Sequence, residues 1–234
     1  MNYSYFFRKI EDGSAPHVPV LTLILFIIAI FIIARNFKKP KIFACIAIAL
    51  QTIMLIWYYS AGLLLTDGLP LYHCRIAIWV ISIGLLLEKR SKFILWMSLL
   101  SIPASLIVLL VRDMDKFAFP HLTNFYYFLG HGVIFLIAIS YIDFFYTDIS
   151  FKDIAIYTLS FHIAVYFINE LFGSNYAYVT SVPFIGSKIP SWLSFIIITV
   201  VIIGMVTTMQ KILEGTDFAR LVKLKNEQFK VKAE

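Results

Sequence analysis

Long apolar segments separated by short polar ones make up most of this chain. Each segment has roughly the 17–25 residues that a helix needs to cross the hydrocarbon core of a bilayer. A strict apolar–polar alternation, the pattern of membrane β-strands, is absent from them. The sequence therefore predicts an all-α polytopic membrane protein, a bundle of seven transmembrane helices near residues 18–34, 42–65, 71–87, 93–111, 124–142, 154–172 and 191–209.

Composition agrees with this pattern. The chain is 60% hydrophobic and 15% charged, with a mean hydropathy of +0.85. Soluble domains are about 45–50% apolar and about 25% charged, so the composition excludes a soluble globular protein. We expect one transmembrane domain over residues 1–210 and a basic, amphipathic cytoplasmic tail over 211–234, the longest polar stretch.

The basic residues give an orientation. Fourteen of the 20 Lys and Arg flank the segment ends on one side, and the other six lie on the opposite side. The positive-inside rule then places the N-terminus outside and the C-terminus in the cytoplasm. The net charge is +6, and most of the Lys and Arg residues lie beside segment ends, where they meet anionic lipid. Membrane lipids are thus the expected partners and nucleic acid is not, and the expected location is the plasma membrane.

Most polar residues near the segments belong to the predicted outer half. Helix 154–172 adds a stripe of His162, Tyr166 and Asn169, spaced by four and three residues. Polar groups in lipid must find partners, so these side chains should face one another. We expect a polar pocket open to the outer leaflet, walled by the third, fifth and sixth helices. Its candidate residues are His73, Cys74, Arg75, His121, Asn124, His131, His162, Asn169, Glu170, Asn175 and Tyr176.

His131 is the strongest single candidate, because an ionisable residue at membrane depth is a functional hypothesis by default. Several other candidates have a structural alternative. His73 and His121 fit the membrane interface, as do Trp57, Tyr58 and Tyr59. Arg75 fits either a lipid headgroup contact or an anion site. Glu170 suits an ion pair as well as acid–base chemistry, and His162 suits a hydrogen bond between helices.

Cys74 is either a small buried hydrophobe or a nucleophile. Its neighbours His73 and Arg75 favour the nucleophile, since nearby cations favour the reactive thiolate. The five histidines lack HxxxH, HExxH or CxxC spacing, and the chain has no nucleophile elbow, Walker loop or Rossmann glycine pattern. We therefore expect no metal and no cofactor.

Three outer-side motifs together resemble the YwaF-type bacterial integral membrane proteins. They are Leu69-Pro-Leu-Tyr-His-Cys74, Phe119-Pro-His121 followed by Phe128-Leu-Gly-His-Gly132, and Gly173-Ser-Asn-Tyr-Ala-Tyr178. The chain departs from that family where histidine stands at His73, one place later than in the pattern Leu-Pro-Leu-His-x-Cys. The shift turns the imidazole by about 100° around a helix, so the resemblance carries over to Cys74 more firmly than to His73.

That family is distantly similar to the androgen-induced-gene lipid hydrolases and a related phospholipid acyltransferase, which use a Thr or Cys nucleophile and a membrane-embedded histidine. The resemblance implies that Cys74 is the nucleophile and His131 the general base, with Asn175 or Tyr176 near the carbonyl oxygen. The implied activity is hydrolysis or transfer of an acyl group from an amphiphilic lipid. A transporter or solute-binding membrane component is the alternative, and the sequence leaves the oligomeric state open.

Helix depth provides a geometric condition for this chemistry. Cys74 lies about three residues into its predicted helix and His131 about seven into its own, an offset of roughly 6 Å. A nucleophile and its base need about 2.6–3.2 Å. The two residues can meet only if the helices tilt or the chain dips inward near Gly68 and Pro70.

Overall fold

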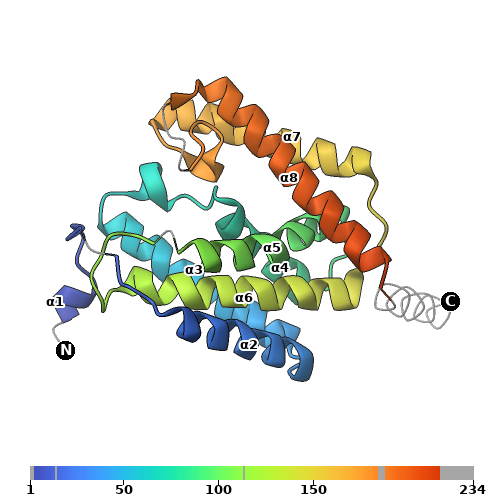
Figure 1. Cartoon of the computed structure of the whole chain (residues 1–234), viewed down its shortest axis with the longest axis horizontal. Coiled ribbons are helices and arrows are strands. Elements are labelled where there is room, and N and C mark those ends of the chain that lie inside the picture. The colour runs from blue at the N-terminus through green and yellow to red at the C-terminus, as the bar shows by residue number, and fades with distance from the viewer. Residues whose placement is uncertain (1–2, 14, 113, 184–187, 217–234) are drawn as a thin grey trace.

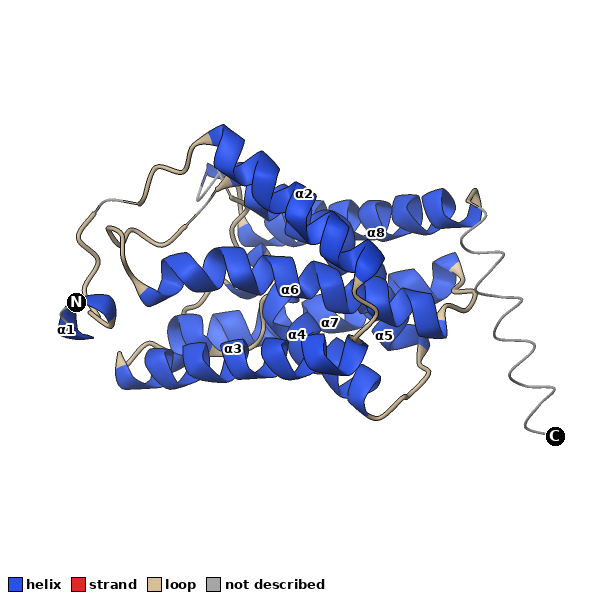
Figure 2. Ribbon diagram, turned by 90° about the horizontal axis from the view of Figure 1, so that it is seen from below, coloured by secondary structure: helices blue, strands red, loops and turns tan. Residues whose placement is uncertain are grey.

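The computed structural model describes residues 3–13, 15–112, 114–183 and 188–216, which form helices and no strands (Figure 2). Five helices are long and apolar enough to cross a membrane, whereas α2 and α4 are shorter apolar helices. The prediction of an all-helical, multi-pass membrane protein is confirmed; seven spans and the orientation stay predictions. The helices are α1 (Tyr3–Phe6), α2 (Val20–Asn36), α3 (Pro40–Ser60), α4 (His73–Leu86), α5 (Lys92–Val111), α6 (Leu122–Phe145), α7 (Phe151–Phe172) and α8 (Ser191–Glu214), with the short turns η1 (Leu64–Gly68) and η2 (Tyr176–Tyr178).

Helix α6 is the centre of the bundle. It packs against α2, α3, α4 and α5, and α7 and α8 form a pair on the side of the bundle away from α2 (Figure 1). The core is built from large side chains such as Phe135, Tyr141 and Trp96. Helices α2, α7 and α8 expose many large apolar residues on their outer faces, as lipid-facing helices do.

The second predicted segment ends earlier than its hydrophobicity indicates. We expected a helix to residue 65, but α3 ends at Ser60 and Gly62 has a φ of +75°. Glycine adopts this left-handed conformation without steric cost, so the chain reverses there. The π-helical turn η1 then folds back onto α3, so closely that a Cβ on Gly68 would lie 2.6 Å from Cβ of Tyr58.

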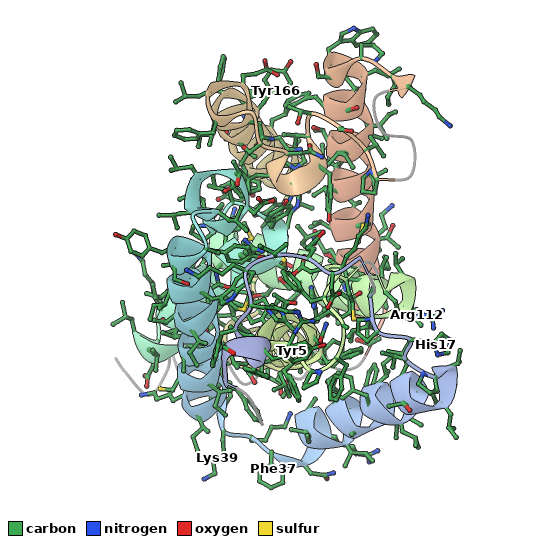
Figure 3. The ribbon with its side chains drawn as sticks, turned by 90° about the vertical axis from the view of Figure 1, so that its left-hand side faces the viewer. Tyr5, His17, Phe37, Lys39, Arg112 and Tyr166 are labelled. Carbon is green, nitrogen blue, oxygen red and sulfur yellow. The ribbon has the colours of Figure 1, made fainter. Side chains whose placement is uncertain are left out.

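Residues 5–13, here called the N-terminal strap, lie across the end of the bundle where α6 begins (Figure 3, near Tyr5). Arg8 donates to the carbonyl oxygen of Ala118, and Asp12 accepts from the Ala118 N–H at 2.8 Å. Lys9 donates to the carbonyl oxygen of Ser60. The strap therefore joins the end of α3 to the loop that precedes α6. The predicted tail lies mostly outside the described residues, because α8 continues to Glu214 and the description ends at 216.

Candidate functional site

A cavity of about 350 Å³, here called the polar cavity, lies at the end of the bundle where α4 and α6 begin. Four of the predicted residues line it together, namely His73, Cys74, Arg75 and His131. Its walls come from α3, α4, α5, α6 and α8, with Asp67 of η1 and Asp115 of the loop before α6. The prediction of α4 and α6 as walls agrees with this lining. The prediction that α7 is a wall was wrong, since α3, α5 and α8 form the remaining walls.

Cys74 belongs to the first turn of α4, whose N-cap is Tyr72. The backbone N–H groups of a first turn have no partner within the helix, and the helix dipole favours negative charge there. Cys74 is half-buried, and burial favours the neutral thiol over the thiolate. The first-turn N–H groups and the helix dipole can stabilise a sulfur anion at this position, provided that a base takes up the proton.

His131 is held in one tautomer. Its Nδ1 lies 2.6 Å from the carbonyl oxygen of Tyr127, one turn earlier on α6. A carbonyl oxygen only accepts, so Nδ1 carries the hydrogen and Nε2 keeps its lone pair in the neutral ring. One of the two neighbouring glycines has a packing explanation, since a Cβ on Gly132 would lie 3.1 Å from Phe26 of α2. His131 is thus a buried imidazole whose basic nitrogen is Nε2.

Arg75 is fixed above the cavity by two bonds. It donates to the carbonyl oxygen of Asp67, and to the Tyr58 hydroxyl at 2.7 Å. Its guanidinium also lies 4.5 Å from the centroid of the Tyr58 ring. An arginine has five N–H donors, so these two bonds leave donors for an anionic or carbonyl oxygen. These contacts favour a role for Arg75 inside the cavity over an extended side chain that reaches the lipid headgroups.

His73 links the cavity to α7 and α8. Its Nε2 lies 2.8 Å from Nε2 of His162, whose Nδ1 lies 2.8 Å from the Thr199 hydroxyl. One of the two facing nitrogens must carry the shared hydrogen. His162, fully buried, therefore makes hydrogen bonds between helices, which was one of its two predicted roles, and it touches the cavity only through His73.

The model of the TMEM164 family matches residues 13–210, which include α2 to α7, most of α8 and every residue named around the polar cavity. The chain belongs to the TMEM164 family. It is thereby a multi-pass integral membrane protein, in agreement with its apolar helices. No curated protein and no solved structure matches the chain significantly. The resemblances to YwaF-type proteins and to lipid hydrolases remain sequence-based expectations.

In this TMEM164 family member, two predicted binding residues lie beneath the N-terminal strap instead of facing the polar cavity. His121 stacks on Phe117 and donates from Nε2 to the Arg8 carbonyl oxygen at 2.9 Å. Its Nδ1 accepts from the N–H and hydroxyl of Thr123, as the N-cap of α6. Burial lowers the pKa of His121, so the neutral ring that these bonds require is favoured. Asn124 donates to the Phe117 carbonyl oxygen.

Three further predicted residues hold the loop around η2 in place through hydrogen bonds. The Asn169 side chain donates to the Tyr176 carbonyl oxygen and accepts from the Tyr176 N–H and the Ser174 hydroxyl. The Asn175 side chain bonds to residues 180 and 181, and the Tyr176 hydroxyl donates to the Leu65 carbonyl oxygen at 2.9 Å. Asn169, Asn175 and Tyr176 do not line the polar cavity. Their polar atoms are used within the fold, which argues against a role beside the carbonyl oxygen. Glu170 is exposed on α7.

The sequence interpretation missed several cavity residues. Tyr58, assigned to an interfacial belt, is buried and binds Arg75. Tyr126 donates to the Gln51 side chain, and Asp115 lines the cavity from a loop. The pair of Tyr126 and Gln51 offers a signal, since a glutamine inside an apolar helix needs a polar partner. Within the described residues, no group of three or more His, Cys, Asp and Glu is arranged to hold a metal ion.

Proposed function

We propose that this chain transfers or hydrolyses the acyl group of an amphiphilic lipid ester in the polar cavity. One observation carries the proposal: Cys74 and His131 line the same cavity, and His131 presents Nε2 as its basic nitrogen. A nucleophile activated by an adjacent base is the usual arrangement for covalent acyl transfer. The apolar outer faces of the helices give such a lipid access to the protein.

The reaction needs only the residues of this cavity. His131 Nε2 accepts the thiol proton, and the Cys74 sulfur attacks the ester carbonyl carbon. The carbon–oxygen bond to the alcohol breaks, the imidazolium returns its proton to the leaving oxygen, and a thioester remains on Cys74. Water or a second alcohol then attacks the thioester with His131 again as base, which gives hydrolysis or transfer. Arg75 and the first-turn N–H groups of α4 would stabilise the oxyanion.

A transporter was the alternative, and it requires a path to the opposite side of the membrane. A second cavity does lie at the other end of α4 and α6, but it shares no lining residue with the polar cavity. This separation favours an enzyme that admits lipid at one end of the bundle.

The test is covalent labelling of the purified protein with an acyl-directed electrophile, a long-chain acyl nitrophenyl ester, followed by mass spectrometry. We expect the acyl adduct on Cys74, its loss in Cys74→Ala, and labelling about 100-fold or more slower in His131→Ala. Cys45→Ala is the matched control, because Cys45 is an exposed cysteine on α3 and should not matter. An adduct on Cys45, or equal labelling rates in wild type and His131→Ala, would refute the proposal.

A further inference from the structure

The polar cavity has a charged end and an apolar end. Its charged lining residues come from η1, the start of α4 and the loop before α6, and they are Asp67, Arg75 and Asp115. All described residues that α5 and α8 contribute to the lining are uncharged. The apolar ones, here called the apolar strip, are Leu100, Ala104, Ile107, Val108, Ile202 and Met205.

Two serines of α5 also line the cavity beside the apolar strip, and their hydroxyls are used within the helix. Ser101 donates to the Met97 carbonyl oxygen at 2.7 Å, and Ser105 donates to the Ile102 carbonyl oxygen at 3.0 Å. Each hydroxyl hydrogen is thereby turned back onto its own backbone. A polar solute would gain little from this end of the cavity, whereas a hydrocarbon chain needs no hydrogen-bond partner.

The apolar strip continues from the two reactive side chains. Ile134 lies one turn beyond His131 on the same face of α6 and lines the cavity too. Three residues of the strip recur every four positions on α5 and span about 12 Å of that helix: Leu100, Ala104 and Val108. An ester carbonyl held beside Cys74 and His131 would therefore have its acyl chain facing the strip.

The apolar strip also reaches the outer surface of the bundle. Ile107 lines the cavity and is 47% exposed, and Leu110 and Val111 beside it are exposed as well. Helix α8 packs against α5 and crosses it obliquely (Figure 1). In a bilayer the exposed apolar surface of α5 contacts lipid chains. A lipid can thus enter sideways between α5 and α8 without its chain leaving the hydrocarbon.

We propose that one acyl chain of the lipid ester enters past Ile107 and lies along the apolar strip, where Ala104 and Met205 set the chain length that the cavity accepts. The volume of about 350 Å³ is near the lower end of ligand pockets, about 300–1,000 Å³, which suits one chain and not a whole lipid. Ala104 is a small, half-buried residue in the middle of the α5 row, so a larger side chain there would occupy the cavity. The inference rests on the proposed acyl chemistry and names the part of the substrate that the strip recognises.

The first measurement is the rate at which acyl nitrophenyl esters label Cys74 in the purified full-length protein. Octanoyl and palmitoyl esters are compared, and the readout is the ratio of the palmitoyl rate to the octanoyl rate. A general loss of folded protein or of reactivity cancels in this ratio. In wild type the palmitoyl ester should react faster, by about fourfold for each further methylene that the strip buries.

Two variants should move the ratio in opposite directions. In Ala104→Leu it should fall by about tenfold or more, the effect of one misplaced methylene in an apolar pocket. In Met205→Ala the cavity is longer, so the ratio should rise. Ala164→Leu is the matched control, because Ala164 is exposed on α7 and does not line the cavity, and its ratio should equal that of wild type. Equal ratios in all four proteins would overturn the inference even if Cys74 is acylated.

The second measurement needs no acyl chemistry. Palmitate with a diazirine near the end of its chain is photo-cross-linked to the Cys74→Ala protein, and the labelled peptides are identified by mass spectrometry. We expect cross-links within residues 100–108 of α5 and 202–205 of α8, and their loss with excess unlabelled palmitate. Such cross-links would support the chain site even if Cys74 is never acylated, which would refute only the proposed function. Cross-links confined to the outer faces of α2 and α7 would overturn the inference.

Discussion

Asn169 offers the sharpest test of how the loop after α7 is held. The Asn169→Ala substitution removes three hydrogen bonds of 2.8–3.0 Å and leaves the N–H of the fully buried Tyr176 without its acceptor. Each lost bond costs about 1 kcal/mol, so the free energy of unfolding should fall by about 3 kcal/mol. At roughly 2–4 °C per kcal/mol for a chain of this size, Tm should fall by about 6–12 °C.

Thermal unfolding in detergent, followed by tryptophan fluorescence, measures this change. Asn169→Asp keeps the oxygen that accepts two of the bonds, so its Tm should lie between those of wild type and Asn169→Ala. Glu170→Ala is the matched control: it removes a longer, exposed side chain one position away and should leave Tm within about 2 °C.

The opposite pattern would refute the reasoning. If Asn169→Ala unfolds at the wild-type temperature while its acyl labelling at Cys74 is lost, Asn169 contacts the ligand and the loop is held by other bonds. The prediction of Asn169 as a binding residue would then be restored.

Two further predictions test other parts of the fold. Gly68→Ala should lower the free energy of unfolding by about 1–3 kcal/mol and slow labelling of Cys74, because the new Cβ meets Tyr58, the partner of Arg75. In Gly204→Ala the new Cβ would meet nothing within 4 Å, so the labelling rate of Cys74 should stay unchanged and Tm should stay unchanged or rise. Equal effects of the two substitutions would contradict the packing argument. Since the pKa of His121 is lowered from 6.5, the unfolded state binds the proton more readily and Tm should fall as pH drops from 7 to 5. In His121→Gln the fall in Tm should be smaller. If the plots of Tm against pH are parallel for wild type and His121→Gln, His121 is excluded as the source of the fall.

The helices were largely predictable, because the length of an apolar run directly reflects the thickness of the bilayer. Their ends were less so. The apolar run of α3 continues past Ser60, and only the conformation of Gly62 ends the helix there. Hydrophobicity does not distinguish a residue inside a helix from one in a buried turn. The first two residues of the turn η1, Leu64 and Leu65, were therefore counted as helix, whereas Asp67 was placed in the loop that follows.

The site was predictable only in part. The motif around Cys74 and the intramembrane position of His131 singled out two residues that line one cavity. Asn169 and Tyr176 looked equally suited to a ligand, but a buried amide near a helix end satisfies backbone groups just as well. Tyr58 looked like an interfacial aromatic because the face of α3 that it occupies depends on packing between helices. Such packing is not encoded in local spacing.

The N-terminal strap also sets an order of assembly. Arg8 and its partner Ala118 are separated by 110 residues, and they meet at the end of α6. Ribosomes add about 5–20 residues each second, so Arg8 must wait about 6–22 s after its own synthesis before its acceptor exists. During that interval α2 to α5 are synthesised, while Arg8 still lacks the acceptor that it has in the folded protein. The contact between Arg8 and Ala118 therefore forms late in synthesis, after α2, α3, α4 and α5 have been made and before α6 follows.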